Sequence, residues 1–241
     1  MPGKLFLVAT PIGNLEDITF RAVQNLKESD IVACEDTRRT KILLNKYEIH
    51  KELISHHSYS TNSKTNYIID KLLDGNKVAY VTDGGTPGIS DPGEILVREA
   101  LKNNIPVECL PGPSACITAL AASGLPTNGF VFIGFLPRKP GKIKKTLLAA
   151  AALEKTVIFY ESPFRIKKTL EICCQIFEPQ SLCVVARELT KIYEEYIRGT
   201  LSEVSGNIAE RKEIKGEIVT LIHTASSDKR EESEETEEEH L

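Results

Sequence analysis

The sequence predicts an α/β protein of two domains, and three features support this fold class. Apolar segments of strand length alternate with segments of helical periodicity over residues 5–110, which is typical of βαβ units around a mostly parallel sheet. A segment rich in proline and glycine at residues 111–115 interrupts this alternation and marks a domain boundary. Beyond it, the short link at residues 195–201 favours antiparallel pairing. We therefore expect an N-terminal α/β domain over residues 1–115, a C-terminal α/β domain with a mixed sheet over residues 116–225, and a cleft between them.

In the N-terminal domain the expected strands and helices follow one another along the chain. The expected strands are residues 5–9, 31–34, 53–54, 77–82 and 107–110, and the expected helices are residues 18–27, 38–47, 64–73 and 94–103. These helices place apolar side chains at helical spacing, as Ile68, Ile69 and Leu72 do in the third of them. Each such helix has an apolar face that can pack on the sheet.

The C-terminal domain begins with an expected helix of small residues, and strands and helices alternate after it. The expected strands are residues 130–135, 156–160, 182–186, 196–199 and 217–223, and the expected helices are residues 116–123, a segment ending near residue 153, residues 163–177 and a short helix ending near Arg211. At the helix over residues 163–177, Ser162 is expected to act as the N-cap and Pro163 to occupy the first helical position.

A glycine-rich loop follows the fourth expected strand and is the most informative segment of the chain. We expect Gly84, Gly85 and Gly88 to adopt positive φ angles and to let backbone N–H groups approach a bound molecule closely. Asp91 is expected to cap the next helix, with Glu94 completing a capping box. The glycine spacing matches neither G-x-x-x-x-G-K-[ST] nor G-x-G-x-x-G. The loop is therefore either a site for a small polar ligand at a strand end or a tight turn without a ligand.

Charge is unevenly distributed along the chain. The formal net charge is −4, but residues 226–241 hold eight acidic and two basic residues, which leaves about +2 for the rest. So acidic a segment, with so few apolar side chains, is expected to be a disordered tail. Basic residues cluster at residues 38–41, 138–145 and 165–168. Such clusters are either an electrostatic footprint for nucleic acid or solvated helix faces.

Composition excludes several classes of protein. The chain has 241 residues, of which 41% are apolar, enough for two hydrophobic cores. No apolar run of about 18 residues and no signal-peptide pattern is present, so we expect a cytoplasmic protein with no membrane segment. The six cysteines lack zinc-ligand spacing and are expected to be reduced core residues, although Cys173 and Cys174 could also be a redox pair. We expect no metal site.

Seven short motifs occur in order along the chain: TPIGNLED (10–17), CEDTR (34–38), DGGTPGISDPG (83–93), PGPSA (111–115), FIGFLPRK (132–139), ESPFR (161–165) and ARELTK (186–191). Together they resemble the motifs of the ribosomal RNA small subunit methyltransferase I family, within the tetrapyrrole-methylase superfamily, and the likeness extends over roughly residues 4–224. Each motif alone is weak, but the set is specific. Family members often carry a His-x-His run where this chain has Ser55-His56-His57-Ser58, so no role is assigned to these histidines.

The resemblance implies a tetrapyrrole-methylase-like fold that binds S-adenosylmethionine in the cleft, usually as a homodimer. It implies 2′-O-methylation of a cytidine ribose in the decoding region of small-subunit (16S) ribosomal RNA, either naked or in the assembled small ribosomal subunit. Two other functions stay open: a tetrapyrrole or diphthine-type methyltransferase on the same fold, or a non-catalytic RNA-binding module that senses the donor. The basic clusters favour RNA over a small substrate.

The donor-binding residues implied by the resemblance lie at strand ends in both domains. They are Pro11, Ile12, Asp83, Gly84, Gly85, Thr86, Ile89, Ser114, Ala115, Tyr160, Ala186 and Gly216. The first nine follow strands of the N-terminal domain, so we expect their loops to converge at one edge of its sheet. For Tyr160 and Ala186, core packing is an equally compatible interpretation.

Candidates for catalysis and for RNA binding follow from the chemistry of methyl transfer. The reaction is an in-line displacement, so the enzyme mainly positions its substrates, and a base or a cation near the ribose oxygen assists a poor nucleophile. The candidate catalytic residues are Lys191, Asp36, Glu161 and Glu188, and the candidate RNA-binding residues are Arg38, Arg39, Arg138, Lys139 and Arg165. The alternatives are a helix cap for Asp36, a structural role at a strand end for Glu161, and a surface ion pair for Lys191.

Overall fold

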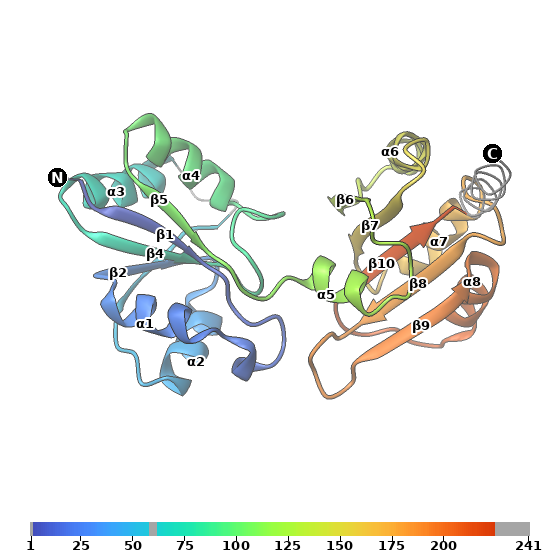
Figure 1. The fold of residues 1–241 in the computed structure, drawn as a ribbon, viewed down its shortest axis with the longest axis horizontal. Coiled ribbons are helices and arrows are strands. Elements are labelled where there is room, and N and C mark those ends of the chain that lie inside the picture. The colour runs from blue at the N-terminus through green and yellow to red at the C-terminus, as the bar shows by residue number, and fades with distance from the viewer. Residues whose placement is uncertain (1, 58–61, 225–241) are drawn as a thin grey trace, which may run out of the picture. The chain divides into compact units, whose positions relative to one another are not determined.

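The structure is a computed structural model that describes residues 2–57 and 62–224, and the chain divides into two compact units, Met1–Ala115 and Cys116–Leu241 (Figure 1). Each unit has its own five-stranded sheet and its own hydrophobic core. The expected acidic tail at residues 226–241 lies outside the described residues. Helices pack on both sheets, which confirms the predicted α/β class.

The sheet of the first unit is parallel in every pairing between its described strands, as predicted. Its strands are β1 (Lys4–Val8), β2 (Ile31–Cys34), β3 (Glu52–Ser55), β4 (Lys77–Val81) and β5 (Val107–Leu110). The strand order is β3-β2-β4-β1-β5, with β1 between β4 and β5. The loops that follow β1, β4 and β5 therefore leave the sheet side by side at its carboxyl edge.

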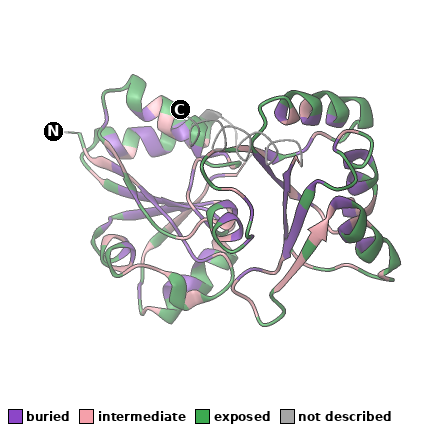
Figure 2. Cartoon of the chain, turned by 45° about the vertical axis from the view of Figure 1, so that its right-hand side comes forward, coloured by how far each residue is buried: buried purple, intermediate pink, exposed green. Residues whose placement is uncertain are grey.

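Helices cover both faces of this sheet because its strands are apolar on both sides. Helices α3 (Asn62–Leu73) and α4 (Gly93–Lys102) pack on the face that carries Leu5 and Tyr80, while α1 (Phe20–Glu28) and α2 (Thr37–Lys46) pack on the face that carries Val8 and Val81 (Figure 1). A short 3₁₀ helix, η1 (Leu15–Asp17), precedes α1 and was not expected from the sequence. Figure 2 shows buried strands between helices that have one buried and one exposed side.

The sheet of the second unit is mixed, again as predicted. Its strands are β6 (Phe130–Phe135), β7 (Thr156–Glu161), β8 (Leu182–Arg187), β9 (Glu195–Thr200) and β10 (Ile218–His223), in the order β6-β7-β10-β8-β9. Only the β6–β7 pair is parallel, while β10 pairs antiparallel with both β7 and β8, and β8 pairs antiparallel with β9. This topology sends the carboxyl ends of β6, β7 and β8 to one edge of the sheet.

Helices α6 (Pro140–Ala151), α7 (Ile166–Cys173) and α8 (Leu201–Glu210) supply the core on one face of this sheet. Leu147, Leu170 and Val204 pack there against strand residues such as Phe159 and Val185. Helix α5 (Ala115–Ala121) begins the unit, and the six cysteines, all within the described residues, are free thiols.

Helix α7 is shorter than the sequence predicted at both ends. It begins at Ile166 rather than at residue 163. The hydroxyl of Ser162 accepts a hydrogen bond from the backbone N–H of Phe164 at 3.3 Å, which forms a local turn instead of a helix cap. The segment from Ser162 to Arg165 is therefore a turn that projects from the sheet edge.

The start of β9 is held by an ion-pair network, and the network predicts a pH-dependent stability. Both oxygens of Glu195 accept from Arg211, at 2.7 and 2.6 Å, and Oε2 also accepts from Arg187 at 3.2 Å. The hydrogen bonds from Arg211 lower the pKa of Glu195 from 4.5 to about 2. A lowered carboxyl pKa contributes stability that is present above pH 4.5 and is lost as the pH falls towards 2.

We expect the melting temperature of the wild type to exceed that of Glu195→Gln near neutral pH. The difference should shrink as the pH falls through the interval from 4.5 to about 2, because the wild-type carboxylate then takes up a proton. Thermal melts of both proteins at several pH values measure it. A difference that stays constant over this interval would show that the network does not couple folding to protonation.

Candidate functional site

The glycine-rich loop after β4 combines left-handed backbone with a close approach to a second loop. Gly85 and Gly88 have φ angles of +90° and +88°. The expectation of a positive φ at Gly84 was wrong, since Gly84 is not among the positive-φ residues. A Cβ at Gly84 would lie 3.1 Å from the backbone oxygen of Pro11 and 3.3 Å from the Cα of Ile12. Gly84 is therefore needed for close packing of two loops, not for its own φ angle.

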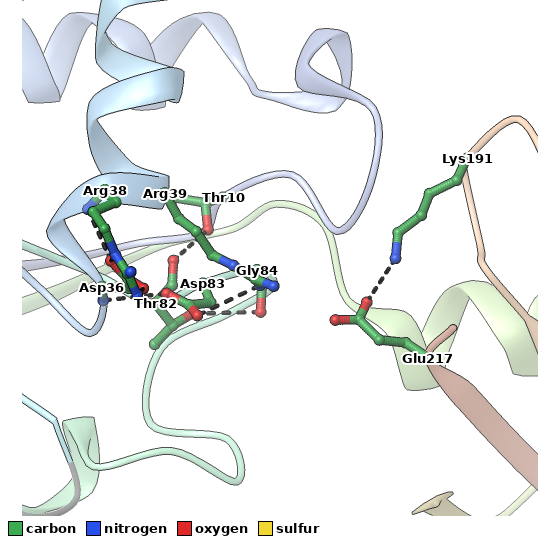
Figure 3. A network of polar contacts seen from close by, with 9 residues as sticks. All are labelled: Thr10, Asp36, Arg38, Arg39, Thr82, Asp83, Gly84, Lys191 and Glu217. Atoms are coloured by element: carbon green, nitrogen blue, oxygen red, sulfur yellow. Dashed lines mark hydrogen bonds and ion pairs between the residues drawn. The ribbon is translucent and has the colours of Figure 1, made fainter. Parts of the chain in front are cut away.

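Three loops of the first unit are fastened to one another at this sheet edge. Thr10 and Gly85 exchange two backbone hydrogen bonds, of 3.0 and 2.8 Å, and the hydroxyl of Thr10 donates to the backbone oxygen of Thr82 at 3.1 Å. The hydroxyl of Thr86 donates to the backbone oxygen of Pro113 at 3.3 Å. These bonds join the loops that follow β1, β4 and β5, which confirms their predicted convergence. Figure 3 shows Thr10 beside Thr82 and Gly84.

Asp91 folds the glycine-rich loop back on itself. Its carboxylate accepts from the backbone N–H groups of Gly88, at 2.9 Å to either oxygen, of Ile89 at 3.1 Å and of Gly93 at 2.7 Å. The expected capping box was wrong: Pro92 is the N-cap of α4 and makes no side-chain cap bond, and Glu94 pairs with Arg98 at 3.7 Å. The Asp91 carboxylate accepts from three backbone N–H groups, whereas a capping box would satisfy only two, so the observed arrangement pairs more backbone donors.

We expect Asp91→Asn to weaken donor binding and to lower stability. In the native loop both carboxylate oxygens of Asp91 accept from backbone N–H groups. In the asparagine variant an NH₂ group replaces one of these oxygens, and it cannot accept from the N–H groups that it faces. Hydrogen bonds to a charged group contribute about 1.5–3 kcal/mol each, so the loss should be at least of this order. Urea unfolding and donor titration measure the two effects. Asp74→Asn, at a surface turn elsewhere in the unit, is the matched control. If Asp91→Asn has the stability and the donor affinity of the wild type, Asp91 does not stabilise the loop.

The exposed part of the three-loop edge offers polar and apolar groups side by side. Asp83 and Gly84 are exposed, Ile89 is 50% exposed although it is a large apolar residue, and Pro11 and Gly85 are buried beneath them. Of the remaining predicted donor-binding residues of this unit, Ile12, Thr86, Ser114 and Ala115 are half-buried. A carboxylate, open backbone and an apolar wall suit a small molecule that carries an ammonium group and an uncharged ring.

A carboxylate and arginine group lies beside the glycine-rich loop (Figure 3). Asp36 is the N-cap of α2: its Oδ1 accepts from the backbone N–H of Arg38 at 2.8 Å, and its Oδ2 accepts from the Arg38 guanidinium at 2.7 Å. Asp83 accepts from the backbone N–H of Asp36 at 3.2 Å and pairs with Arg39 at 3.4 Å. The hydrogen bond from the Arg38 side chain lowers the pKa of Asp36 to about 2. Asp36 thus has the structural role of a helix cap and stays ionised near neutral pH.

In the second unit, Glu161 and Arg165 brace the loops at the ends of β6 and β7. Glu161 is 2% exposed, and its carboxylate accepts from the backbone N–H of Ser162 and from the hydroxyl of Thr169, both at 2.7 Å. Arg165 pairs with Glu161 at 3.3 Å and donates to the backbone oxygens of residues 136 and 137, at 3.3 and 2.7 Å. Both side chains thus hold protein groups together, and their predicted catalytic and RNA-binding roles stay predictions.

Lys191 lies between two carboxylates at the ends of β8 and β10. Its ammonium donates to Glu188 at 2.8 Å and to Glu217 at 3.0 Å, and Figure 3 shows the second contact. Burial lowers the pKa of Lys191, but the hydrogen bonds that its ammonium donates to these carboxylates outweigh this effect and keep the pKa above its ordinary value. The hydrogen bond from Lys191 holds the pKa of Glu188 below its ordinary value. At neutral pH Lys191 is therefore a cation held beside the ionised Glu188.

Packing and backbone geometry alone explain which residue types stand at three further predicted donor-binding positions, Gly216, Tyr160 and Ala186. Gly216 has a φ of +91°, and a Cβ there would overlap the side chain of Glu188. Tyr160 packs edge-on against Phe132 and Phe135, and burial raises its pKa. Ala186 is fully buried within the β8 ladder. Core packing, the alternative interpretation for Tyr160 and Ala186, is therefore observed, and their contact with a donor stays a prediction.

The structure brings the predicted site residues into separate groups. In the first unit, the nine predicted donor-binding residues lie on the three loops, and the group of Asp36, Arg38 and Arg39 lies beside them. In the second unit, Lys191 lies close to Glu188 and Gly216. Arg138 and Lys139 are exposed in the loop after β6. Two residues that form hydrogen bonds within these groups, Thr10 and Glu217, were not predicted from the sequence. Glu217 could have been found because it directly follows Gly216, and Thr10 because it begins the motif TPIGNLED (10–17).

Comparison with known proteins supports the same family from two directions. Residues 4–205 match the family model of the tetrapyrrole (corrin/porphyrin) methylases. The ribosomal RNA small subunit methyltransferase I of Halalkalibacterium halodurans is 48% identical over 220 residues, which cover 91% of this chain and 75% of that protein. The chain belongs to the ribosomal RNA small subunit methyltransferase I family. The protein of the same name from Bacillus subtilis is 45% identical, and the match covers 96% of this chain and 79% of that protein. The one from Thermotoga maritima is 44% identical, and the match covers 91% of this chain and 98% of that protein.

Solved structures confirm the fold expected for this family. A cobalt precorrin-4 methyltransferase aligns with a TM-score of 0.71 and 19% identity, covering 91% of this chain and 94% of its own. A diphthine synthase aligns with a TM-score of 0.71 and 13% identity, and the alignment covers 92% of this chain and 90% of the synthase. Methyltransferases of this family use S-adenosylmethionine. Among the described residues, no helix is both long and apolar enough to cross a bilayer.

Proposed function

We propose that this chain transfers a methyl group from S-adenosylmethionine to the 2′-hydroxyl of a cytidine ribose in the decoding region of small-subunit ribosomal RNA. The observation that carries the proposal is the 48% identity, over 91% of the chain, to a protein named ribosomal RNA small subunit methyltransferase I. We further propose that it acts as a homodimer in the cytoplasm, where its ribosomal substrate is found. The likeness to tetrapyrrole and diphthine enzymes is below 25% identity and supports the fold alone.

The three-loop edge of the first unit fits the donor. S-adenosylmethionine supplies an electrophilic methyl group on a sulfonium, together with an ammonium, a carboxylate and an adenine. The exposed carboxylate of Asp83 suits the ammonium, the exposed backbone of Gly84 suits polar donor atoms, and Ile89 offers an apolar surface. Asp91 and the bond between Thr86 and Pro113 hold this edge in one shape before the donor arrives.

Among the four candidate catalytic residues, Lys191 has the state that best suits the reaction. As the ribose oxygen attacks the methyl carbon, the bond from that carbon to the sulfonium sulfur breaks and S-adenosylhomocysteine leaves as a neutral thioether. The hydroxyl proton passes to solvent water, and negative charge develops on the oxygen as it does so. A cation beside that oxygen lowers the barrier, and Lys191 is kept charged by Glu188 and Glu217. Glu188 then acts as a positioning residue, since it holds the ammonium in place. Asp36 and Glu161 serve as a helix cap and as a buried brace.

The substrate test uses small ribosomal subunits from cells that lack this protein. We expect labelled methyl groups to pass from the donor to the RNA of these subunits with repeated turnover. Donor binding without transfer would support the non-catalytic RNA-binding module instead. Transfer to a tetrapyrrole or a diphthine precursor, but not to the subunits, would support the other methyltransferases on this fold.

A further inference from the structure

Two aromatic side chains stand exposed where the parallel strands β6 and β7 leave the sheet. Phe164 is 96% exposed and Phe135 is 63% exposed, although both are large apolar residues. The parallel pairing of β6 with β7 sends both strand ends to the same edge, so the loops that carry the two rings are neighbours. Exposed aromatic rings at a shaped sheet edge indicate a surface that contacts another molecule.

The two loops are fastened to each other, so the rings do not project from free chain. Arg165 follows Phe164 and donates to the backbone oxygens of residues 136 and 137, at 3.3 and 2.7 Å. The buried carboxylate of Glu161 holds the same guanidinium at 3.3 Å. The ring of Phe135 packs edge-on against Tyr160, with 5.4 Å between the ring centroids. This support lowers the entropy that binding would otherwise cost.

The surroundings of the two rings are basic. Residues 135–145 and 162–168 contain eight lysines and arginines and no acidic residue. Arg138 and Lys139 are exposed three and four residues after Phe135, and Lys142 and Lys168 are exposed in the adjoining helices. Glu161, which directly precedes the second of these segments, is buried and already hydrogen-bonded. The partner that this charge suits is therefore an anion with flat, apolar rings.

We propose that Phe164, assisted by Phe135, is a stacking platform for unstacked bases of the RNA substrate, while Arg138 and Lys139 contact its phosphates. Sequence-specific RNA recognition targets single-stranded bases that stack on aromatic side chains, and a neighbouring basic surface follows the backbone. Arg165, predicted from the sequence to bind RNA, is a positioning residue in this arrangement, because it fixes the platform from below. This inference rests on the proposed function, since it takes RNA as the substrate.

The chain contains no tryptophan, so Phe164→Trp places a single fluorescent reporter on the platform. We expect its emission to be quenched by a single-stranded fragment of the decoding region and to be unaffected by the donor. Phe164→Ala should weaken binding of the fragment by roughly 5- to 150-fold, the range measured for loss of one base stack. Phe164→Leu should lose most of this affinity although it keeps an apolar side chain, while Phe164→Trp should retain it.

Salt dependence separates stacking from phosphate contact. Phe164→Ala should leave the slope of log affinity against log salt unchanged, whereas Arg138→Ala and Lys139→Ala should each lower it by about 0.7. Phe130→Ala, at the opposite end of β6, is the matched control and should bind as the wild type does. Circular dichroism and donor titration confirm that each variant is folded.

Two outcomes would overturn the inference while leaving the proposed function intact. The first is wild-type affinity of Phe164→Ala for RNA that the wild type methylates. The second is a change in Phe164→Trp emission with protein concentration alone, together with dissociation of Phe164→Ala in sedimentation, which would make this edge an interface between copies of the chain. If the wild type neither binds nor methylates the RNA, the proposed function fails and this inference fails with it.

Discussion

Replacement of Gly85 by valine is expected to abolish donor binding. Gly85 has a φ of +90°, a conformation that costs an L-residue about 1–2 kcal/mol and costs a β-branched residue more. Relaxing that strain would break the two hydrogen bonds between Gly85 and Thr10 that hold the glycine-rich loop against the loop after β1. We expect donor affinity to fall at least about tenfold, which corresponds to about 1.4 kcal/mol, as measured by calorimetry.

Gly124→Val is the matched control for this change. Gly124 has a φ of +78°, and nothing lies within 4 Å of a Cβ placed there. It belongs to the second unit, whereas the three loops belong to the first. The control should lose stability to a similar extent through backbone strain but bind the donor normally. Unchanged donor affinity in folded Gly85→Val would place the donor site outside the glycine-rich loop.

Lys191→Ala is expected to slow turnover strongly while both substrates still bind. If the ammonium stabilises charge on the ribose oxygen, its loss should reduce kcat by about 10²–10³, as for other preorganised donors to a developing oxyanion. Affinities for the donor and for RNA should change little, because the effect is confined to the transition state. Single-turnover kinetics at saturating RNA and donor measure the step.

Two further variants test whether position or charge matters at Lys191. Lys191→Arg keeps the charge and should retain part of the rate. Lys215→Ala removes a neighbouring lysine that pairs with Glu213 at 3.0 Å on the surface, and it should behave as the wild type. Equal rates for Lys191→Ala and the wild type would remove Lys191 from the mechanism and leave Asp36, Glu161 and Glu188 as candidates.

Most of the fold could be predicted because local signals and tertiary packing agree along most of this chain. The alternation of apolar strands and amphipathic helices identified the parallel sheet. Antiparallel pairing was expected from a short link at residues 195–201. It is observed, but residues 195–200 are strand β9 itself, which pairs antiparallel with β8. The errors lie where a side chain prefers a local backbone partner. Ser162 forms a turn with Phe164, and Asp91 binds Gly88, Ile89 and Gly93 instead of starting a capping box.

The site could be predicted in outline but not in its internal bonds. Loops that follow neighbouring parallel strands must meet at one sheet edge, so the convergence of the loops after β1, β4 and β5 followed from strand order. The pairing of Lys191 with Glu217 could not be predicted, because these residues are 26 positions apart and meet only when β8 and β10 pair. The burial of Glu161 could not be predicted either, because its hydroxyl partner Thr169 lies eight positions further on, in α7, and reaches it only when α7 packs beside β7.

The product of the reaction decides whether the proposed chemistry is correct. Small ribosomal subunits from cells lacking this protein would be incubated with the protein and the donor, and their RNA digested to nucleosides and to mapped fragments for mass spectrometry. We expect 2′-O-methylcytidine to appear in the fragment from the decoding region and to form at least about 100-fold more slowly with Lys191→Ala. Methyl groups on a base, on another nucleoside, or nowhere in the RNA would contradict ribose methylation of a cytidine by this enzyme.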